Sequence, residues 1–312
     1  MTSPSGRWKL GLLLALSTAT MWGVLPIALN GVMETLDPLT TTFFRLSLAA
    51  ILMTPYLVVR RRLPNRGKLR SPQLFFQLLA AGLLLCANYG LYVFGLQRTS
   101  PEAAQVMIQI APMLLLLAGV FLFKEHFSSA QWFGFFAFAS GLVLFFNHHL
   151  GDVFVDLNDY GLGLLIILLA AICWTGYAIM QKILLQEFTS EETMLAIYWL
   201  GTLLFLPFCN FSSLGQLTGM QWALLAFCGL NTIIAYGSFA EALVHIEASR
   251  VSATIALTPL LTVGIVQLIP IPGITAEPLG VLSIIGAILV VCGSITTAVA
   301  KKPAKQRKII NL

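Results

Sequence analysis

The stretch 101–123, PEAAQVMIQIAPMLLLLAGVFLF, decides the fold of this chain. Beyond its first two residues it carries no charge, and Gln105 and Gln109 are its main polar side chains. A run of about 18 apolar residues is long enough to cross the hydrocarbon core of a membrane, about 30 Å thick, as a helix. The sequence therefore predicts a transmembrane helix over this stretch.

Further apolar blocks of similar length lie on either side, separated by short charged segments. Three of them begin with a proline after Asp37, Ser71 or Ser100, and proline is well tolerated in the first turn of a helix. Ten-residue alternating strands are absent, so helices are the only spanning structures that fit. We predict an all-α polytopic membrane protein whose ten spans are 9–30, 38–59, 72–95, 101–123, 130–147, 160–181, 192–208, 219–242, 250–270 and 278–299.

The composition excludes a water-soluble globule. Of 312 residues, 58% are hydrophobic and only 10% are charged, against about 25% charged in a typical soluble domain. The pI near 9.0 comes from short basic runs beside the spans, which indicates membrane orientation and no nucleic-acid partner.

The five cysteines show no CxxC spacing, and they predict neither a disulfide nor a metal site. The first apolar run lacks a convincing cleavage site and is interpreted as a retained span.

Lysine and arginine are distributed unequally between the two sides. With the N-terminus inside, sixteen of the eighteen fall on the inner face, while Arg98 lies outside and Arg45 lies within a span. Such a bias marks the cytoplasmic side. We expect a multi-pass protein of the cell inner membrane with an even number of spans, both termini cytoplasmic and a basic cytoplasmic tail over 300–312.

The two halves of the chain resemble each other. Matches at offsets of 152 or 147 residues recur in the same order, including Trp22 with Trp174, Tyr89 with Tyr236 and Pro112 with Pro259. They predict two repeats, 9–147 and 160–299. Because each repeat has five spans, the second must enter the membrane the opposite way. Inverted repeats are typical of secondary transporters, whose binding site forms near the midplane; duplication kept only for packing is the alternative.

An ordered set of residues carries a resemblance to a known family. In the first half it comprises Trp22-Gly23, Pro38, Arg45, Tyr89, Ser100, Pro112, Glu125, Gly134 and Gly141, and in the second half Trp174, Tyr236, Ala248-Ser249, Pro259, Glu277, Gly286 and Gly293. The chain resembles the EamA-type branch of the drug/metabolite transporter superfamily over nearly its whole length.

The resemblance implies a ten-helix carrier, often an exporter, with a central cavity lined by spans 1, 3, 4, 6, 8 and 9. One departure stands out, because the second half holds Ile197-Tyr198-Trp199 where a match to Arg45 would fall. Whatever Arg45 does is therefore done once.

Two positions suggest charge chemistry. Arg45 lies about 12 Å of helix rise into its span and could attract a carboxylate or phosphate of the substrate; snorkelling, or pairing with Glu34 or Asp37, is the alternative. Glu241 precedes His245 by four residues on one helix face. It is a candidate for proton coupling, or it is an interfacial glutamate paired with His245 or Arg250.

Aromatic and amide side chains in the cavity-facing spans are candidate substrate contacts, although packing or an interfacial belt would also explain a single aromatic. With Arg45, the candidates are Trp22, Asn88, Tyr89, Tyr92, Gln105, Gln109, Trp174, Tyr177, Asn231 and Tyr236. Gln105 and Gln109 should form a polar stripe one turn apart.

Pro112 and Pro259 interrupt helix hydrogen bonding and are candidate hinges, or static bends. The pairs Gly134 with Gly141 and Gly286 with Gly293 suggest close helix packing or a dimer face. His148-His149 with Asp152 is a weak candidate for a metal, and we expect none.

The sequence as a whole favours a secondary transporter, an exporter of small amphiphilic metabolites such as amino acids, working by alternating access. It would be a monomer or a homodimer in the lipid bilayer, without cofactors. No nucleotide-binding motif and no nucleophile–base pair indicates an enzyme. An integral-membrane enzyme, or a channel, acting on lipid-like or small polar substrates is the alternative.

Overall fold

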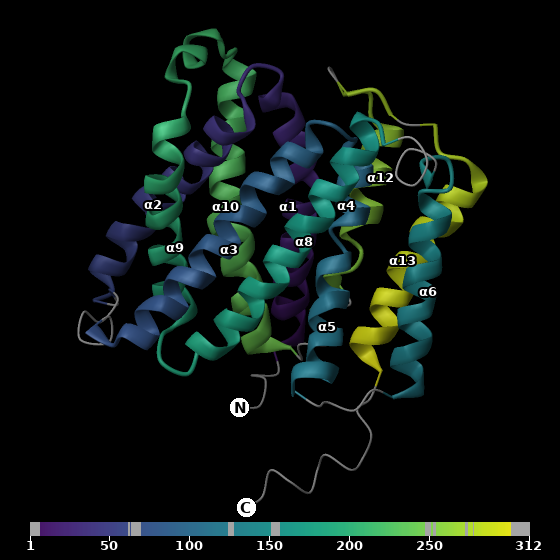
Figure 1. Ribbon diagram of the computed structural model, residues 1–312, viewed down its shortest axis with the longest axis horizontal. Coiled ribbons are helices and arrows are strands. Elements are labelled where there is room, and N and C mark those ends of the chain that lie inside the picture. Colours follow the sequence, from purple (N-terminus) through teal and green to yellow (C-terminus); the bar gives the residue numbers. More distant parts are fainter. Residues whose placement is uncertain are drawn as a thin grey trace, which may run out of the picture.

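The computed structural model describes residues 7–61, 63, 70–123, 128–150, 157–246, 251, 254–271, 274–276 and 278–300. Within these ranges the chain is a helical bundle (Figure 1), and its single β-bridge joins Ile271 and Ile274. Its helices are α1 (Trp8–Met33), α2 (Pro38–Val59), α3 (Pro72–Leu96), α4 (Pro101–Met107), α5 (Ile110–Phe123), α6 (Ser129–Phe145), α8 (Asp159–Leu184), α9 (Ser190–Phe205), α10 (Gly219–His245), α12 (Thr258–Leu268) and α13 (Val281–Val299), with 3-10 turns η2 (Leu206–Phe208) and η3 (Phe211–Gln216).

Local chemistry sets the helix starts. Pro38, Pro72 and Pro101 are the first residues of α2, α3 and α4, as predicted. The Asp37 carboxylate caps α2 by accepting hydrogen bonds from the backbone N–H groups of Leu39 and Thr40, at 3.0 and 2.9 Å. Such a cap satisfies donors that the first turn of a helix leaves without partners.

Among the described residues, five helices are long and apolar enough to cross a membrane: α1, α2, α3, α8 and α10. Shorter apolar helices include α6, α12 and α13. Large apolar side chains on the outside of the bundle are exposed, among them Phe133 on α6, Leu203 on α9 and Leu268 on α12. An all-helical bundle with an apolar exterior is the architecture of a polytopic membrane protein.

Helices of one half pack on helices of the other half, and the pairs run antiparallel. The closest contacts join α6 to α13, α3 to α8, α1 to α10 and α2 to α9. In α6 and α13, Gly134 faces Gly293 while Gly141 faces Gly286, so residue numbers rise along one helix as they fall along the other. In Figure 1, α2 with α9 and α6 with α13 lie at opposite sides of the bundle, and the other pairs lie between them.

Two helices are broken one turn before a proline. The predicted span 101–123 divides at Ile108 and Gln109 into α4 and α5, and the following proline is Pro112. In the second half, residues 256–257 form a turn before α12, whose second residue is Pro259. Proline cannot donate to the carbonyl four residues earlier and its ring clashes with that carbonyl, which explains why both breaks precede the proline.

Each break has its own local hydrogen bonds. The carbonyl of Ile108 accepts a bond from the backbone N–H of Ala111 at 3.0 Å. The carbonyl of Ile255, which Pro259 leaves without a helical donor, accepts a bond from the Thr258 hydroxyl. Gln105 belongs to α4 and Gln109 lies in the break that follows it. The polar stripe expected of these two amides stays a prediction.

Candidate substrate-binding site on the repeat axis

Two tyrosines mark the point where the halves meet. Tyr89 on α3 and Tyr236 on α10 correspond to each other in the repeat, and their side chains are neighbours in one apolar cluster. A residue can touch its own symmetry mate only close to the symmetry axis. The two tyrosines therefore locate the pseudo-twofold axis of the bundle.

The two tryptophans of the repeat converge on the same point. The Trp22 ring on α1 meets the Tyr236 ring edge to face, with centroids 5.3 Å apart, and lies 6.1 Å from the Phe239 ring. Trp174 on α8 packs in the same apolar cluster as Tyr236. We call Trp22, Tyr89, Trp174 and Tyr236 the axis cluster.

Arg45 is buried beside this cluster. Its side chain is 3% exposed, and its guanidinium carbon lies 4.9 Å from the centroid of the Tyr89 ring, in a cation–π contact. In the part of the chain that the structure describes, the Arg45 Nε atom has no hydrogen-bond partner. Asp37, one of the carboxylates expected as a partner, instead caps α2. Within the described residues, Arg45 is thus held by an aromatic face, and neither snorkelling nor a pair with Asp37 is observed.

Several predicted contacts use their polar groups in helix packing, and two of them, Asn88 and Asn231, join the two halves. The Asn88 amide donates to the carbonyl of Ala170 on α8 at 2.8 Å, and the Asn231 amide donates to that of Met21 on α1 at 2.6 Å. The Tyr177 hydroxyl donates to the Met194 sulfur at 3.2 Å. These bonds support the packing interpretation for the donor groups of these three residues.

The other polar candidates lie around α4. Gln105 is buried and accepts a bond from the Tyr92 hydroxyl at 3.5 Å. Gln109 is also buried, at the break after α4. These amides place hydrogen-bonding groups on the element that interrupts the first repeat.

The coupling candidates form an ion-pair geometry at the end of α10. A Glu241 carboxylate oxygen lies 3.2 Å from Nε2 of His245, and the glutamate side chain is 59% exposed while the histidine is 8% exposed. The expected pair with His245 is therefore present. The other expected partner, Arg250, lies outside the described residues.

Two buried residues near these elements were not among the predicted contacts. Tyr198, in the region that replaces a second arginine, is 1% exposed and donates to the carbonyl of Thr232 at 3.0 Å. Glu102 on α4 is fully buried and accepts a bond from Gln267 on α12 at 3.4 Å. The sequence signal for Tyr198 was its place in the region of the second half that corresponds to Arg45 in the first half. For Glu102 the signal was a carboxyl at the start of an apolar block.

The histidines considered for a metal lie elsewhere, past the end of α6. The His149 ring stacks on the Tyr160 ring, with centroids 4.0 Å apart. Asp152 lies outside the described residues. Within the described part of the chain, no group of three or more His, Cys, Asp or Glu residues is placed to hold a metal ion.

A helical membrane bundle of two repeats related by a pseudo-twofold axis is typical of secondary transporters. Comparison with protein families agrees. The EamA-like transporter family matches this chain twice, over residues 9–147 and 161–299. The chain belongs to the EamA-like transporter family and is a membrane-embedded transporter.

Individual relatives extend over nearly the whole chain. The uncharacterized inner membrane transporter YhbE of Escherichia coli (strain K12) is 38% identical over 296 residues, which cover 94% of this chain and 92% of the relative. An uncharacterized transporter of Haemophilus influenzae is 35% identical over 94% of this chain and 96% of its own length. A solved crystal structure at 17% identity superposes with a TM-score of 0.64 over 93% of this chain and 98% of its own, which shows a shared fold.

Proposed function

We propose that this protein is a secondary transporter that exports small amphiphilic metabolites, such as amino acids, by alternating access. The substrate would bind at the axis cluster beside Arg45. The protein would cross the membrane ten times, with α4 and α5 forming one span and both termini in the cytoplasm.

The buried arginine is the observation that carries the proposal. Removing a guanidinium from water costs several kcal/mol unless an opposite charge or good hydrogen bonds compensate. The Nε atom of Arg45 makes no such bond to any residue that the structure describes. A carboxylate on the substrate would supply both, because the guanidinium fork matches carboxylate geometry. The rings of Trp22, Tyr89 and Tyr236 would cover the apolar part of the same molecule.

The pseudo-twofold symmetry supports the transport mechanism. If the two repeats exchange roles, the bundle has two equivalent conformations that open to opposite sides around one site. The breaks before Pro112 and Pro259 occur at matching points, so they are candidate hinges for this exchange. Glu241 with His245 would couple the cycle to a proton gradient.

The proposed orientation combines structure and sequence. The start of α1 and the end of α13 lie at the same end of the bundle (Figure 1), as an even number of spans requires. Arg7, Arg60 and Arg70 lie at helix ends on this side. A cytoplasmic excess of basic residues is the general rule. Tags at the two ends should therefore be accessible from one side only, the inside.

Counterflow in liposomes tests the transport proposal. Purified protein would be reconstituted, the vesicles loaded with unlabelled leucine or phenylalanine, and the entry of the radiolabelled amino acid followed. We expect loading to accelerate entry, with saturation at high substrate, because a carrier exchanges one bound molecule for another. Protein-free liposomes are the control. A linear flux without counterflow would indicate a channel and contradict the proposal.

A screen of toxic amino-acid analogues tests direction and substrate together. Cells that express the protein should resist the analogues that it exports and should accumulate less of them. Greater sensitivity to the same analogues would indicate import instead. Unchanged resistance to every amino-acid analogue would contradict the proposed substrate class.

A further inference from the structure

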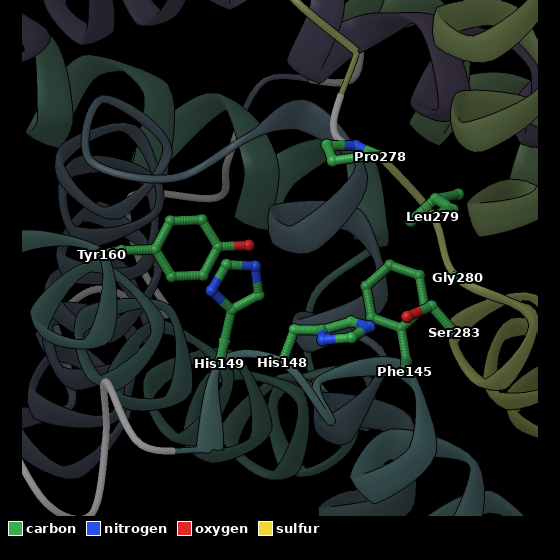
Figure 2. A pocket seen from close by; sticks show the side chains of 8 residues that line it. All are labelled: Phe145, His148, His149, Tyr160, Pro278, Leu279, Gly280 and Ser283. Carbon is green, nitrogen blue, oxygen red and sulfur yellow. The ribbon is translucent and has the colours of Figure 1, made fainter.

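A cavity lies at the end of the bundle opposite the start of α1, outside the axis cluster. It has a volume of about 600 Å³ and is lined by Phe145, His148, His149, Tyr160, Pro278, Leu279, Gly280 and Ser283. Figure 2 shows these side chains around the opening, contributed by the end of α6, the start of α8 and the segment that leads into α13. Pockets for small ligands have volumes of about 300–1,000 Å³, so this cavity is large enough for one.

Aromatic rings form much of its wall. His149 and Tyr160 are stacked with an angle of 19° between their planes, and Phe145 lies on the other side of the opening in Figure 2. Flat ring faces pack well against another flat ring. The shape of the wall therefore favours a planar molecule.

A few polar atoms accompany the rings. Ser283 accepts a bond from the Asn147 amide at 3.1 Å, which leaves its hydroxyl hydrogen available to donate. The His148 ring reaches the Gly280 backbone, since a Cβ built on Gly280 would lie 3.1 Å from its Nε2 atom. Ring nitrogens of histidine and the hydroxyls of serine and tyrosine can each donate or accept.

The lack of charge on the described lining residues restricts the class of ligand that the cavity can bind. Among the described residues, none of the eight that line the cavity is Asp, Glu, Lys or Arg. A charged ligand would lose its hydration there without an opposite charge in the wall, which is costly. A phospholipid phosphate is disfavoured for this reason. A metal ion is disfavoured because His148 and His149 contact different partners, Gly280 and Tyr160.

We propose that this cavity is a second binding site, separate from the axis cluster, for a neutral, planar aromatic or heteroaromatic small molecule with a hydrogen-bonding group. The ligand lies between Phe145 and the stacked His149 and Tyr160 rings. It bonds to Ser283 or His148. The site lies between α6, α13 and the first turn of α8. The same helix, α8, carries Trp174 of the axis cluster, about 21 Å of helix rise beyond Tyr160.

Histidine NMR tests the site directly, whether or not the protein transports amino acids. The chain has four histidines, so selective 13C-histidine labelling of the full protein in nanodiscs gives few signals, each assigned by a His→Asn variant. The probe is benzimidazole at neutral pH, which is planar and has one donor and one acceptor. We expect a saturable shift of the His148 and His149 signals and no shift of the His245 signal.

Two variants and one control make the result specific. Tyr160→Leu removes the stacked ring and should weaken benzimidazole binding about tenfold, the scale of one lost aromatic contact. Gly280→Val should push His148 into the cavity and also weaken binding. Phe133→Leu, at a residue on the exposed face of α6 that is 72% exposed, should leave binding unchanged. The unliganded spectrum and the melting temperature show whether each variant is folded.

Each of four other results would overturn the proposal. The first is that the His148 and His149 signals do not shift with benzimidazole, or shift without saturation, and the second is that the His245 signal shifts equally. The third is that the folded Tyr160→Leu and Gly280→Val variants bind benzimidazole fully. The fourth is that cyclohexanol shifts the His148 and His149 signals as much as benzimidazole does. Shifts with ZnCl2 but not with benzimidazole would identify a metal site instead. Contacts from lipid protons to His148 that benzimidazole does not displace would identify a lipid site.

Discussion

The α6–α13 and α2–α9 pairs each join a helix to its own repeat mate, but they keep the symmetry to different extents. Between α6 and α13 the contacts are reciprocal, since Gly134 faces Gly293 and their mates Gly286 and Gly141 face each other. Between α2 and α9 the match is lost at Arg45, whose counterpart region is Ile197-Tyr198-Trp199. The two repeats keep matching residues where helix backbones touch, and they differ where a charge is buried.

The difference has a physical basis. A glycine contact between backbones tolerates no added atom on either helix, so both copies are constrained alike. A buried charge is costly, and a single guanidinium is enough to bind one carboxylate. A second arginine beside the first would add repulsion and a second desolvation cost. The predictions below test this contrast, from the largest expected effect to the smallest.

Substitution of Gly141 by alanine should have the largest effect. A Cβ there would lie 2.6 Å from the Val290 backbone nitrogen and 2.8 Å from the Gly286 carbonyl oxygen, so two helices must move apart. We expect a destabilisation of about 3 kcal/mol, the upper part of the usual range for overpacking. Unfolding in detergent measures it. At Gly264, where no atom of the described residues lies within 4 Å of a built Cβ, alanine should be neutral or slightly stabilising. Equal stability of both variants would contradict the close-packing interpretation.

Substitution of Arg45 by lysine should weaken transport of carboxylates about tenfold, because lysine keeps the charge but loses the planar fork and the contact with Tyr89. Uptake of an amino acid and of its uncharged-carboxamide analogue would be compared in liposomes over a range of concentrations. The carboxamide should be affected much less. An equal loss for both would show that Arg45 has a structural role.

Substitution of Pro259 by alanine should slow turnover severalfold with little change in substrate affinity. Alanine restores an N–H group that can bond to the Ile255 carbonyl, so the helix break becomes less favourable. The maximal rate and the half-saturating concentration of counterflow separate the two effects. Pro55→Ala, inside α2 and away from the breaks, is the matched control. Unaltered turnover in Pro259→Ala would mean that the break is a static bend.

Substitution of Glu241 by glutamine should remove the pH dependence of transport and leave substrate binding intact, because an amide cannot exchange a proton. The pH profile of uptake and equilibrium binding in detergent measure the two properties. Glu187→Gln, at an exposed residue in the turn after α8, should retain the wild-type profile. If Glu241→Gln also retains it, the pair with His245 is only an interfacial contact.

The smallest effect concerns Cys209, in the loop where α9 meets the start of α2. Burial, and secondarily the negative charge of Asp37, raise the pKa of its thiol to about 11. The thiolate is the reactive form, so alkylation by maleimide should be slow at pH 7 and accelerate as the pH rises towards 11. Asp37→Asn keeps a capping side chain but removes the charge, which lowers the pKa and should speed alkylation severalfold at pH 8. A membrane-impermeant maleimide should react from outside the cell. Unchanged alkylation kinetics would show that Asp37 does not influence the thiol.

Helix positions were largely predictable from the sequence, and long-range contacts were not. The starts of α2, α3 and α4 follow from local proline chemistry, which acts within one turn. The contact of Arg45 with Tyr89 depends on how α2 and α3 pack together. Asn88 and Asn231 were selected as polar groups in apolar helices, but only the packed bundle supplies the carbonyls of Ala170 and Met21 that they bond.

Sequence alone established the helical membrane class and a duplicated unit, because apolar length and ordered matches are properties of the chain read in one dimension. Tertiary structure decided that Tyr89 meets its own mate Tyr236, that Arg45 faces a ring, and that a cavity opens between α6, α8 and α13. Such features depend on the relative positions of helices far apart in the chain. Those positions are fixed by side-chain packing throughout the bundle, which no local pattern encodes.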